Sequence, residues 1–329
     1  MLKAPRNAGL DLLRTLACLL VVAYHLRTVA GLDFGPLNAV IQGGDSGVYV
    51  FFALSGYLLY RPFLRGEVDL EGFAIKRLAR ILPGYFIALA CLAVITRNPL
   101  PIHNVLPYLT MTATYNPELR GFLGNAWTLS AELIFYVALP SLSRFLSSAP
   151  IPRLSILAML SVVASVLYGS VDNGSIAWIV GAFPFVLYAF VPGMLLAVVE
   201  VRDPAMFKQL GAPWVAVVGA GAIFAQTLMH NFPVALATGI GTPLLIGWLA
   251  SVRLPFGRAL AFTGGASYAM YLWHKDLLIS FGPGGVIIAA IGAAASWALV
   301  ERPVLELAHA VVARRRIPRE PEAVPAIAS

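Results

Sequence analysis

The stretch that decides the fold is residues 10–30, which read LDLLRTLACLLVVAYHLRTVA. About 20 predominantly apolar residues in a helix are enough to cross the hydrocarbon core of a membrane. Arg14 and His25 interrupt this run. An arginine at the centre of a membrane helix costs roughly 2.5–3.5 kcal/mol on insertion scales, so ionisable residues in such helices are usually functional. We therefore expect a membrane helix with two functional polar positions.

Arg14 and His25 are expected to lie on nearly the same helix face. They are eleven residues apart, and eleven steps of about 100° bring a helix back close to its starting direction. The axial separation is roughly 16 Å at 1.5 Å per residue. Asp11, one turn before Arg14, also faces that side.

The composition predicts an all-α polytopic membrane protein. Hydrophobic residues make up 59% of 329 positions and charged residues 12%, unlike the balance of a soluble domain. We expect a bundle of about ten transmembrane helices. Residues 1–312 form a single transmembrane domain in this interpretation, and residues 313–329 form a disordered cytoplasmic tail. The expected spans are 8–30, 46–64, 81–97, 122–145, 154–170, 176–199, 213–229, 233–252, 259–280 and 284–312.

The basic residues predict the orientation. With ten spans both termini lie on one side, and that side collects nearly all the lysines and arginines between the spans, whereas the opposite loops hold only Arg97 and Arg120. The positive-inside rule then places both termini in the cytoplasm.

The first helix resembles a signal peptide, but it is too long and lacks a small-residue cleavage site, so we expect it to be retained. Cys18 and Cys91 both lie in apolar spans, which indicates neither a disulfide framework nor a metal site.

A basic cluster precedes the predicted third span. Lys76, Arg77 and Arg80 lie on the expected cytoplasmic side. If the helix includes them, Arg77 and Arg80 share a face and can grip phosphate oxygens bidentately. The alternative is ordinary positive-inside charge in contact with lipid head groups.

The predicted fourth span carries a carboxylate. Thr128, Glu132 and Tyr136 recur every four residues after Trp127 and so line one face. An acid in a membrane normally pairs across the bundle, and Arg14 and His25 are the partners we expect for Glu132. A purely structural ion pair is the alternative.

Two further segments are polar. Ser267, Tyr271 and His274 fall on one face of the predicted ninth span, as supporting or acceptor-side residues or as part of an interfacial aromatic belt. Ser55 precedes Gly56 in the second span, where small residues let helices approach closely, so packing is the simpler role of Ser55.

Together these segments resemble the membrane acyltransferase 3 family of integral-membrane O-acyltransferases, which modify bacterial polysaccharides, lipid-linked sugars and some antibiotics. The matches run in order along nearly the whole chain. They are Asp11-Leu12-Leu13-Arg14 with His25, Phe51-Phe52 with Ser55-Gly56, Arg77 with Arg80, Trp127 and Leu129 with Glu132 and Phe135-Tyr136, Ser267-Tyr268 with Tyr271-Leu272 and His274, and Glu301-Arg302-Pro303.

The resemblance implies which residues matter and which donor is used. In the family the arginine and histidine of the first span and the paired arginines are regarded as essential, which corresponds here to Arg14, His25, Arg77 and Arg80. The donor is implied to be cytoplasmic acyl-CoA, with acetyl the commonest group, used as a co-substrate with no permanently bound cofactor. The implied acceptor is a carbohydrate, a lipid-linked sugar or a glycosylated small molecule, and the implied location is the bacterial cytoplasmic membrane. Nucleic acid is not an expected partner.

The residues permit two chemical routes. Direct transfer to a hydroxyl requires a base, and His25 has a suitable pKa class, with Glu132 orienting or stabilising the ring. The second route makes His25 an acyl-carrying nucleophile. Arg14, Arg77, Arg80 and Lys76 would bind the donor, and Asp11, Ser55, Trp127, Tyr136, Tyr271 and His274 would support the site or face the acceptor. A proton-coupled transporter is the main competing class, because it uses the same intramembrane arginine, histidine and glutamate.

Overall fold

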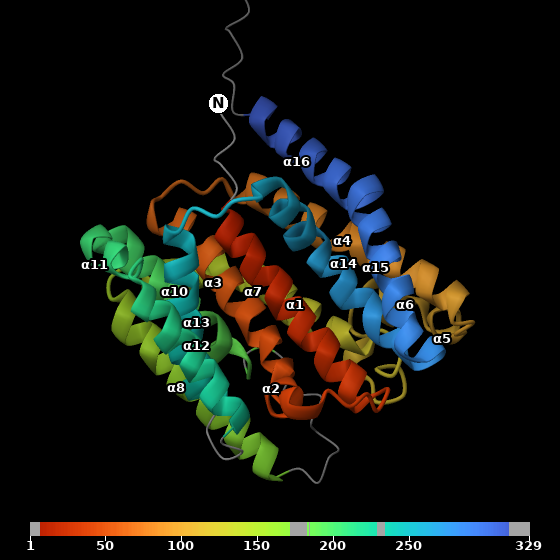
Figure 1. Ribbon diagram of the computed structural model, residues 1–329. Coiled ribbons are helices and arrows are strands. Elements are labelled where there is room, and N and C mark those ends of the chain that lie inside the picture. Colours follow the sequence, from red (N-terminus) through yellow and green to blue (C-terminus); the bar gives the residue numbers. More distant parts are fainter. Residues whose placement is uncertain (1–6, 172–182, 184, 229–233, 316–329) are drawn as a thin grey trace, which may run out of the picture.

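The computed structural model describes residues 7–171, 183, 185–228 and 234–315, and every regular element within them is helical. Figure 1 shows the helices gathered into one bundle. The longer helices are α1 (Ala8–Thr28), α3 (Gly47–Leu64), α4 (Leu70–Ile95), α7 (Trp127–Leu146), α8 (Pro150–Val171), α10 (Leu187–Arg202), α12 (Pro213–Leu228), α13 (Val234–Ser251), α14 (Gly257–Phe281), α15 (Gly285–Ser296) and α16 (Arg302–Arg315). The short ones are η1 (Gly35–Leu37), α2 (Asn38–Gln42), η2 (Gly44–Ser46), α5 (Leu100–His103), α6 (Val105–Leu109), η3 (Ala113–Tyr115), η4 (Gly124–Ala126), α11 (Pro204–Gln209), η5 (Gly282–Gly284) and η6 (Trp297–Glu301).

Within the described residues, six helical stretches are long and apolar enough to cross a membrane. They are Ala8–Thr28, Gly44–Leu64, Leu70–Ile95, Gly124–Leu146, Pro150–Leu167 and Gly257–Arg315, and two shorter apolar helices are Pro213–Ala225 and Gly239–Ser251. The multi-pass membrane architecture expected from the sequence is confirmed. The number of spans and the side on which each terminus lies stay predictions. Residues 176–182 and 184 of the predicted sixth span, residue 229 of the seventh, residue 233 of the eighth and residues 316–329 of the predicted tail lie outside the described residues.

Two helices extend beyond the boundaries predicted for the membrane spans. The third span was expected to begin at residue 81, but α4 begins at Leu70, so Lys76, Arg77 and Arg80 lie inside a helix. The helix extends because nothing in residues 70–80 breaks it and polar side chains are tolerated where a helix leaves the apolar layer. At the other end of the chain, α16 continues to Arg315, so residues 313–315 are helical.

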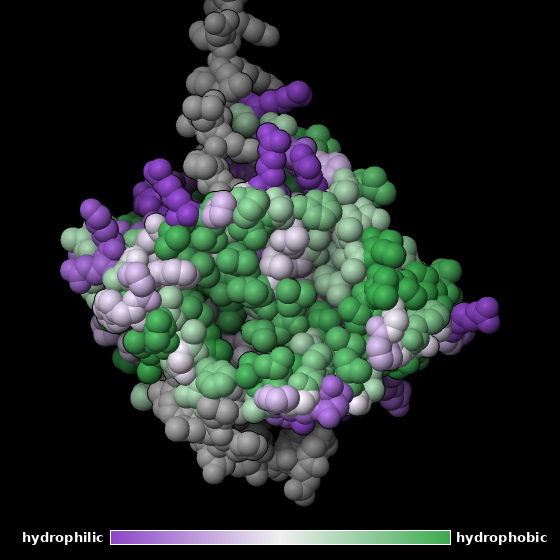
Figure 2. Space-filling model, in the orientation of Figure 1, coloured by the Kyte–Doolittle hydropathy of each residue, from purple (hydrophilic) through white to green (hydrophobic). Residues whose placement is uncertain are grey.

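The outer surface carries the apolar layer that a membrane protein requires. Val217 and Ile291 are 72% and 67% exposed, far more than an apolar side chain in a soluble core. Figure 2 shows a broad green band of hydrophobic residues, with hydrophilic residues gathered above and below it. The start of α1 and the end of α16 lie at the same end of the bundle (Figure 1).

Helix α1 packs against both α3 and α14 (Figure 1). The Asn7 side chain caps its N-terminus by accepting hydrogen bonds from the Gly9 and Leu10 backbone N–H groups over 2.9 and 3.2 Å. The same amide donates to the Ala250 carbonyl over 2.9 Å. This double use of Asn7 fixes the start of α1 against α13.

Helices α3 and α10 cross through two glycines. A Cβ on Gly56 would lie 2.2 Å from the Phe190 carbonyl oxygen, and a Cβ on Gly193 would lie 1.8 Å from the Ala53 carbonyl oxygen. Each glycine therefore lets the backbone of the other helix approach, as small residues do in membrane bundles. The packing role predicted for the Ser55-Gly56 pair belongs to Gly56.

The chain reverses at η5 between α14 and α15, where Gly282 has a φ of +60°. Helix α15 then passes into α16 through one π-helical turn, η6. That turn buries Glu301 completely, and its Oε1 accepts a hydrogen bond from Ser296 over 2.7 Å. It also places Trp297 against Gly265, where a Cβ would lie 2.3 Å from the indole.

The connection between α4 and α7 is held to the bundle by hydrogen bonds. The Tyr85 hydroxyl donates to the Tyr108 carbonyl over 2.7 Å, and the Tyr108 hydroxyl donates to the Leu119 carbonyl over 2.8 Å. Burial raises the pKa of Tyr108 to about 12, so it remains a neutral donor. Nearer to α7, the Leu123 N–H donates to Asp276 over 3.1 Å and the Asn125 side chain donates to the Tyr271 carbonyl over 2.7 Å. This connection is thereby joined to α14.

Candidate functional site

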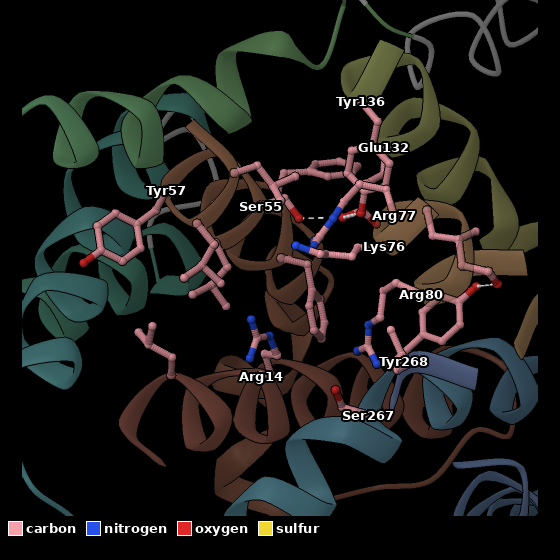
Figure 3. Close-up of a pocket in the computed structure, with 18 of the residues that line it drawn as sticks. Arg14, Ser55, Tyr57, Lys76, Arg77, Arg80, Glu132, Tyr136, Ser267 and Tyr268 are labelled. Atoms are coloured by element: carbon pink, nitrogen blue, oxygen red, sulfur yellow. Dashed lines mark hydrogen bonds between the residues drawn. The ribbon is translucent and has the colours of Figure 1, made fainter. Parts of the chain in front are cut away.

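A cavity of about 1160 Å³ lies inside the bundle, larger than the roughly 300–1,000 Å³ of typical small-molecule sites. Its walls come from α1, α3, α4, α7 and α14, with additional side chains from α10, α11, α13, η6 and α16. Eight of the twelve site residues predicted from the sequence line it: Arg14, Ser55, Lys76, Arg77, Arg80, Glu132, Tyr136 and Tyr271. The other four, Asp11, His25, Trp127 and His274, do not. Figure 3 shows the labelled side chains of the first group converging from different helices.

Two arginines on α4 form a basic wall of the cavity. The Arg77 guanidinium carbon lies 5.9 Å from the Phe73 ring centroid, and that of Arg80 lies 5.4 and 5.5 Å from the rings of Tyr268 and Trp297. Within the described residues, neither guanidinium makes a hydrogen bond or ion pair with another side chain. Aromatic rings hold these cations by their faces, which leaves the N–H groups available for an anion in the cavity.

Arg14 is held by an acid on its own helix. Its Nη1 lies 2.8 Å from Oδ1 of Asp11, and Asp11 is completely buried. Gly264 makes room for this arrangement, since a Cβ there would lie 2.7 Å from Asp11. Asp11 is thus behind the cavity wall, and Arg14 is the member of the pair that lines the cavity.

Glu132 has different partners from those expected. The Ser55 hydroxyl donates to its Oε1 over 2.6 Å, and the Tyr136 hydroxyl donates to the same oxygen over 2.7 Å. The predicted pairing of Glu132 with Arg14 or His25 is therefore wrong. Both donors bind Oε1, and one comes from its own helix and the other from α3. Ser55, for which packing was the simpler interpretation, instead links α3 to α7.

His25 is paired with His274. Nδ1 of His25 and Nε2 of His274 lie 3.0 Å apart, which joins α1 to α14 across 249 positions of sequence. His274 is fully buried, whereas His25 is partly exposed. The sequence spacing placed His25 on the same helix face as Arg14, and His274 on the same face as Tyr271. No pattern within either helix indicated that the two histidines contact each other.

Aromatic rings connect the cavity to the histidine pair. Phe51 and Tyr271 both line the cavity, and their ring centroids are 6.2 Å apart. The Tyr271 ring is in turn 5.9 Å from the His274 ring. Trp127, outside the cavity, packs edge-on against Phe52 at 5.8 Å, so its role in this structure is to support α3.

The sequence reasoning missed several cavity residues. Arg61 and Glu200 form an ion pair with an N···O distance of 2.5 Å although 139 positions separate them. Trp297 contacts Arg80 from the π-helical turn. The Glu301-Arg302-Pro303 segment pointed to the π-helical turn η6 in the sequence, but it did not indicate that Trp297 of this turn contacts Arg80.

Residues 7–300 match the family model described as an acyltransferase domain. The chain belongs to this acyltransferase family. It is 29% identical to nodulation protein 10 of Rhizobium leguminosarum bv. viciae over 93% of this chain and 95% of that protein. It is 26% identical to the exopolysaccharide production protein ExoZ of Rhizobium meliloti (strain 1021) over 81% of this chain and 91% of that protein.

A third relative matches a shorter region. A Staphylococcus aureus (strain COL) protein named "Putative O-acetyltransferase" is 29% identical over 40% of this chain and 24% of its own length. No solved structure gives a significant match. The family membership makes the chain an acyltransferase enzyme rather than the transporter that was the competing class. The cavity with its basic wall is the candidate active site of this acyltransferase.

Proposed function

We propose that this acyltransferase moves an acyl group, most simply acetyl, from cytoplasmic acyl-CoA to a hydroxyl of a carbohydrate, a lipid-linked sugar or a glycosylated small molecule, in the cytoplasmic membrane of a bacterium. The observation that carries the proposal is the pair of guanidinium groups, Arg77 and Arg80, which aromatic rings fix inside a cavity of about 1160 Å³. No other side chain of the described residues uses their N–H groups. A guanidinium is the side chain best suited to bidentate phosphate binding. Acyl-CoA offers phosphates at one end and a thioester at the other.

The remaining cavity charges fit a polyanionic donor. Six lysines and arginines line the cavity against three glutamates. Arg61 is paired with Glu200 and Arg302 with Glu306. Arg14 is in turn paired with Asp11, whereas Arg77 and Arg80 form no ion pair within the described residues. This excess of positive charge favours binding of the phosphates.

The acceptor class follows from the relatives. One is named for exopolysaccharide production and another for O-acetyl transfer, which supports a hydroxyl of a saccharide as the acceptor.

The basic end of the bundle, with Arg61, Lys76 and Arg302 among the cavity residues, is the end assigned to the cytoplasm by the positive-inside rule. The acceptor would then approach from the opposite side of the membrane. His25 lies toward that side, eleven residues after Arg14 in α1, and His274 lies toward it seven residues after Ser267 in α14.

In the reaction we propose, Nε2 of His25 accepts the proton of the acceptor hydroxyl as its oxygen attacks the thioester carbonyl carbon. The C–S bond breaks, and the departing CoA thiolate receives the proton back from His25. The products are an ester and the free thiol. In the covalent variant, His25 itself attacks the thioester carbonyl carbon, the C–S bond breaks, and the thiolate takes the proton that the acylated ring gives up, so free thiol is released before an acceptor binds. The acceptor hydroxyl then attacks the acyl group, its proton returns to His25, and the ester leaves.

The test is thioester cleavage by the purified full-length protein in lipid nanodiscs. Acetyl-CoA with a saccharide acceptor should release free thiol, and His25→Ala should abolish that release while the protein still elutes as a folded species. His103→Ala is the matched control, because His103 is exposed on α5 and outside the cavity. Wild-type turnover in His25→Ala would contradict the assignment. A burst of thiol with donor alone would select the covalent variant.

A further inference from the structure

His274 makes two hydrogen bonds that together determine where its proton lies. Its Nδ1 is 3.1 Å from the carbonyl oxygen of Met270, one helical turn earlier. Its Nε2 is 3.0 Å from Nδ1 of His25. Because a carbonyl oxygen only accepts hydrogen bonds, Nδ1 of His274 must carry a hydrogen. In the neutral ring Nε2 is then an acceptor.

The same reasoning extends to His25. Since Nε2 of His274 accepts, Nδ1 of His25 must be the donor, and that nitrogen carries the hydrogen of the neutral His25 ring. The nitrogen left with a lone pair is Nε2 of His25.

We propose that His274 is a positioning residue that fixes the tautomer of His25, so that Nε2 of His25 is the unprotonated nitrogen that reacts. The proposal rests on the proposed function, in which His25 takes the proton of the acceptor. His274 is suited to this task because it is fully buried and its own tautomer is fixed by the backbone of α14. An orienting partner that sets the tautomer of a catalytic histidine is a general device of acyl-transfer sites, and here the partner is an imidazole.

Neighbouring aromatic rings hold both imidazoles. The Tyr24 ring packs edge-on against His25 with centroids 5.3 Å apart, and the Tyr271 ring lies 5.9 Å from His274. The two imidazole centroids are 5.0 Å apart with planes inclined at 49°. Rotation of His25 about its side-chain bonds would therefore break a hydrogen bond and two ring contacts.

The proton balance during transfer is simple. His25 gains the hydroxyl proton on Nε2 and becomes an imidazolium, whose Nδ1–H continues to donate to Nε2 of His274. His274 keeps its own hydrogen on Nδ1, bonded to Met270, and no net proton passes to it. When His25 returns the proton to the thiolate, both rings are again in their starting tautomers.

Two amide substitutions at residue 274 separate positioning from packing. In His274→Gln the amide oxygen reaches the place of Nε2 and still accepts from His25. In His274→Asn the shorter amide reaches only the place of Nδ1. We expect His274→Gln to keep turnover within about fivefold of wild type. His274→Asn should lower kcat by roughly 10–100-fold, the range for loss of a partner that orients a histidine. The KM for acyl-CoA should change in neither variant, because the donor phosphates bind elsewhere.

A spectroscopic measurement tests the tautomer directly and does not depend on turnover. The chain has five histidines, so ¹⁵N-histidine resonances of the full-length protein in lipid are assignable by single substitutions. The wild type should show His25 with a protonated Nδ1 and an unprotonated Nε2, and this pattern should persist in His274→Gln and be lost in His274→Asn. A wild-type His25 protonated on Nε2, or equal activity of the Gln and Asn variants, would overturn the proposal. If wild type itself releases no thiol, the proposed function fails, whereas the tautomer result stands on its own.

Discussion

Ser55 and Glu132 lie 77 positions apart in the chain, yet the Ser55 hydroxyl donates to Oε1 of Glu132 over 2.6 Å. A hydrogen bond to a charged group contributes about 1.5–3 kcal/mol in proteins. Both residues line the cavity. This link therefore holds α3 against α7 at the level of the site.

The first prediction concerns this link. Ser55→Ala should lower the thermal stability and activity, because Glu132 then keeps only the Tyr136 hydroxyl as a donor. The double variant Ser55→Ala with Glu132→Gln should lose less than the sum of the single losses, which a double-mutant cycle measures. Ser143→Ala is the control, because the Ser143 hydroxyl bonds only locally to the Pro140 carbonyl of the same helix. Additive losses would show that the hydrogen bond is energetically unimportant.

The second prediction concerns donor binding. Arg77→Ala and Arg80→Ala should each raise the KM for acyl-CoA by about tenfold or more, which corresponds to at least 1.4 kcal/mol, with a smaller change in kcat. Arg77→Lys should recover only part of the loss, because lysine lacks the bidentate geometry. Steady-state kinetics with varied donor provides the measurement, with Arg258→Ala, exposed and outside the cavity, as control. A change confined to acceptor kinetics would refute the phosphate role.

The third prediction concerns the crossing of α3 and α10. Gly193→Ala should strongly destabilise the protein, since the added Cβ would lie 1.8 Å from a backbone oxygen that has no room to move. Gly221→Ala is the matched control in a helix, with no atom within 4 Å of the added Cβ. Thermal unfolding in detergent should show a lowered midpoint for the first and an unchanged or slightly raised one for the second, because alanine is the better helix former. Equal stability of the two variants would contradict this packing.

The fourth prediction concerns orientation. In a variant without native cysteines, Glu118→Cys in the connection between α4 and α7 should react with a membrane-impermeant maleimide added outside intact cells. Arg258→Cys at the start of α14 should react only after permeabilisation, because the basic end is assigned to the cytoplasm. Both positions are exposed in the structure. The reverse labelling pattern would show that the bundle is inserted the other way round.

The sequence predicted well what depends on periodicity within one helix. The shared face of Arg77 and Arg80 and the shared face of Glu132 and Tyr136 both follow from spacing, and both pairs line the cavity. Helix α4 begins at Leu70, before the span predicted from residue 81, because a helix that leaves the apolar layer keeps its backbone hydrogen bonds.

Contacts between helices were not predictable in the same way. His25 meets His274, and Glu132 meets Ser55, because of how the helices cross. The crossing geometry depends on small residues such as Gly56 and Gly193. The sequence shows where these glycines are but not which helix packs against them. Glu132 was assigned charged partners because an intramembrane acid usually has one. In this bundle its hydrogen-bond partners are instead two hydroxyl groups, those of Ser55 and Tyr136.

The hydrogen bonds from Leu123 and Asn125 to α14 have a consequence for biosynthesis. Residues 1–256 leave the ribosome before α14 is made, and until then the connection after α4 lacks its anchor and His25 lacks His274. We expect the growing chain to be unreactive towards cellular thioesters while it inserts. A chain terminated before residue 271 would then lack both anchors and His274, and would be a poorly active membrane protein rather than a thioesterase that depletes the acyl-CoA pool of the cell.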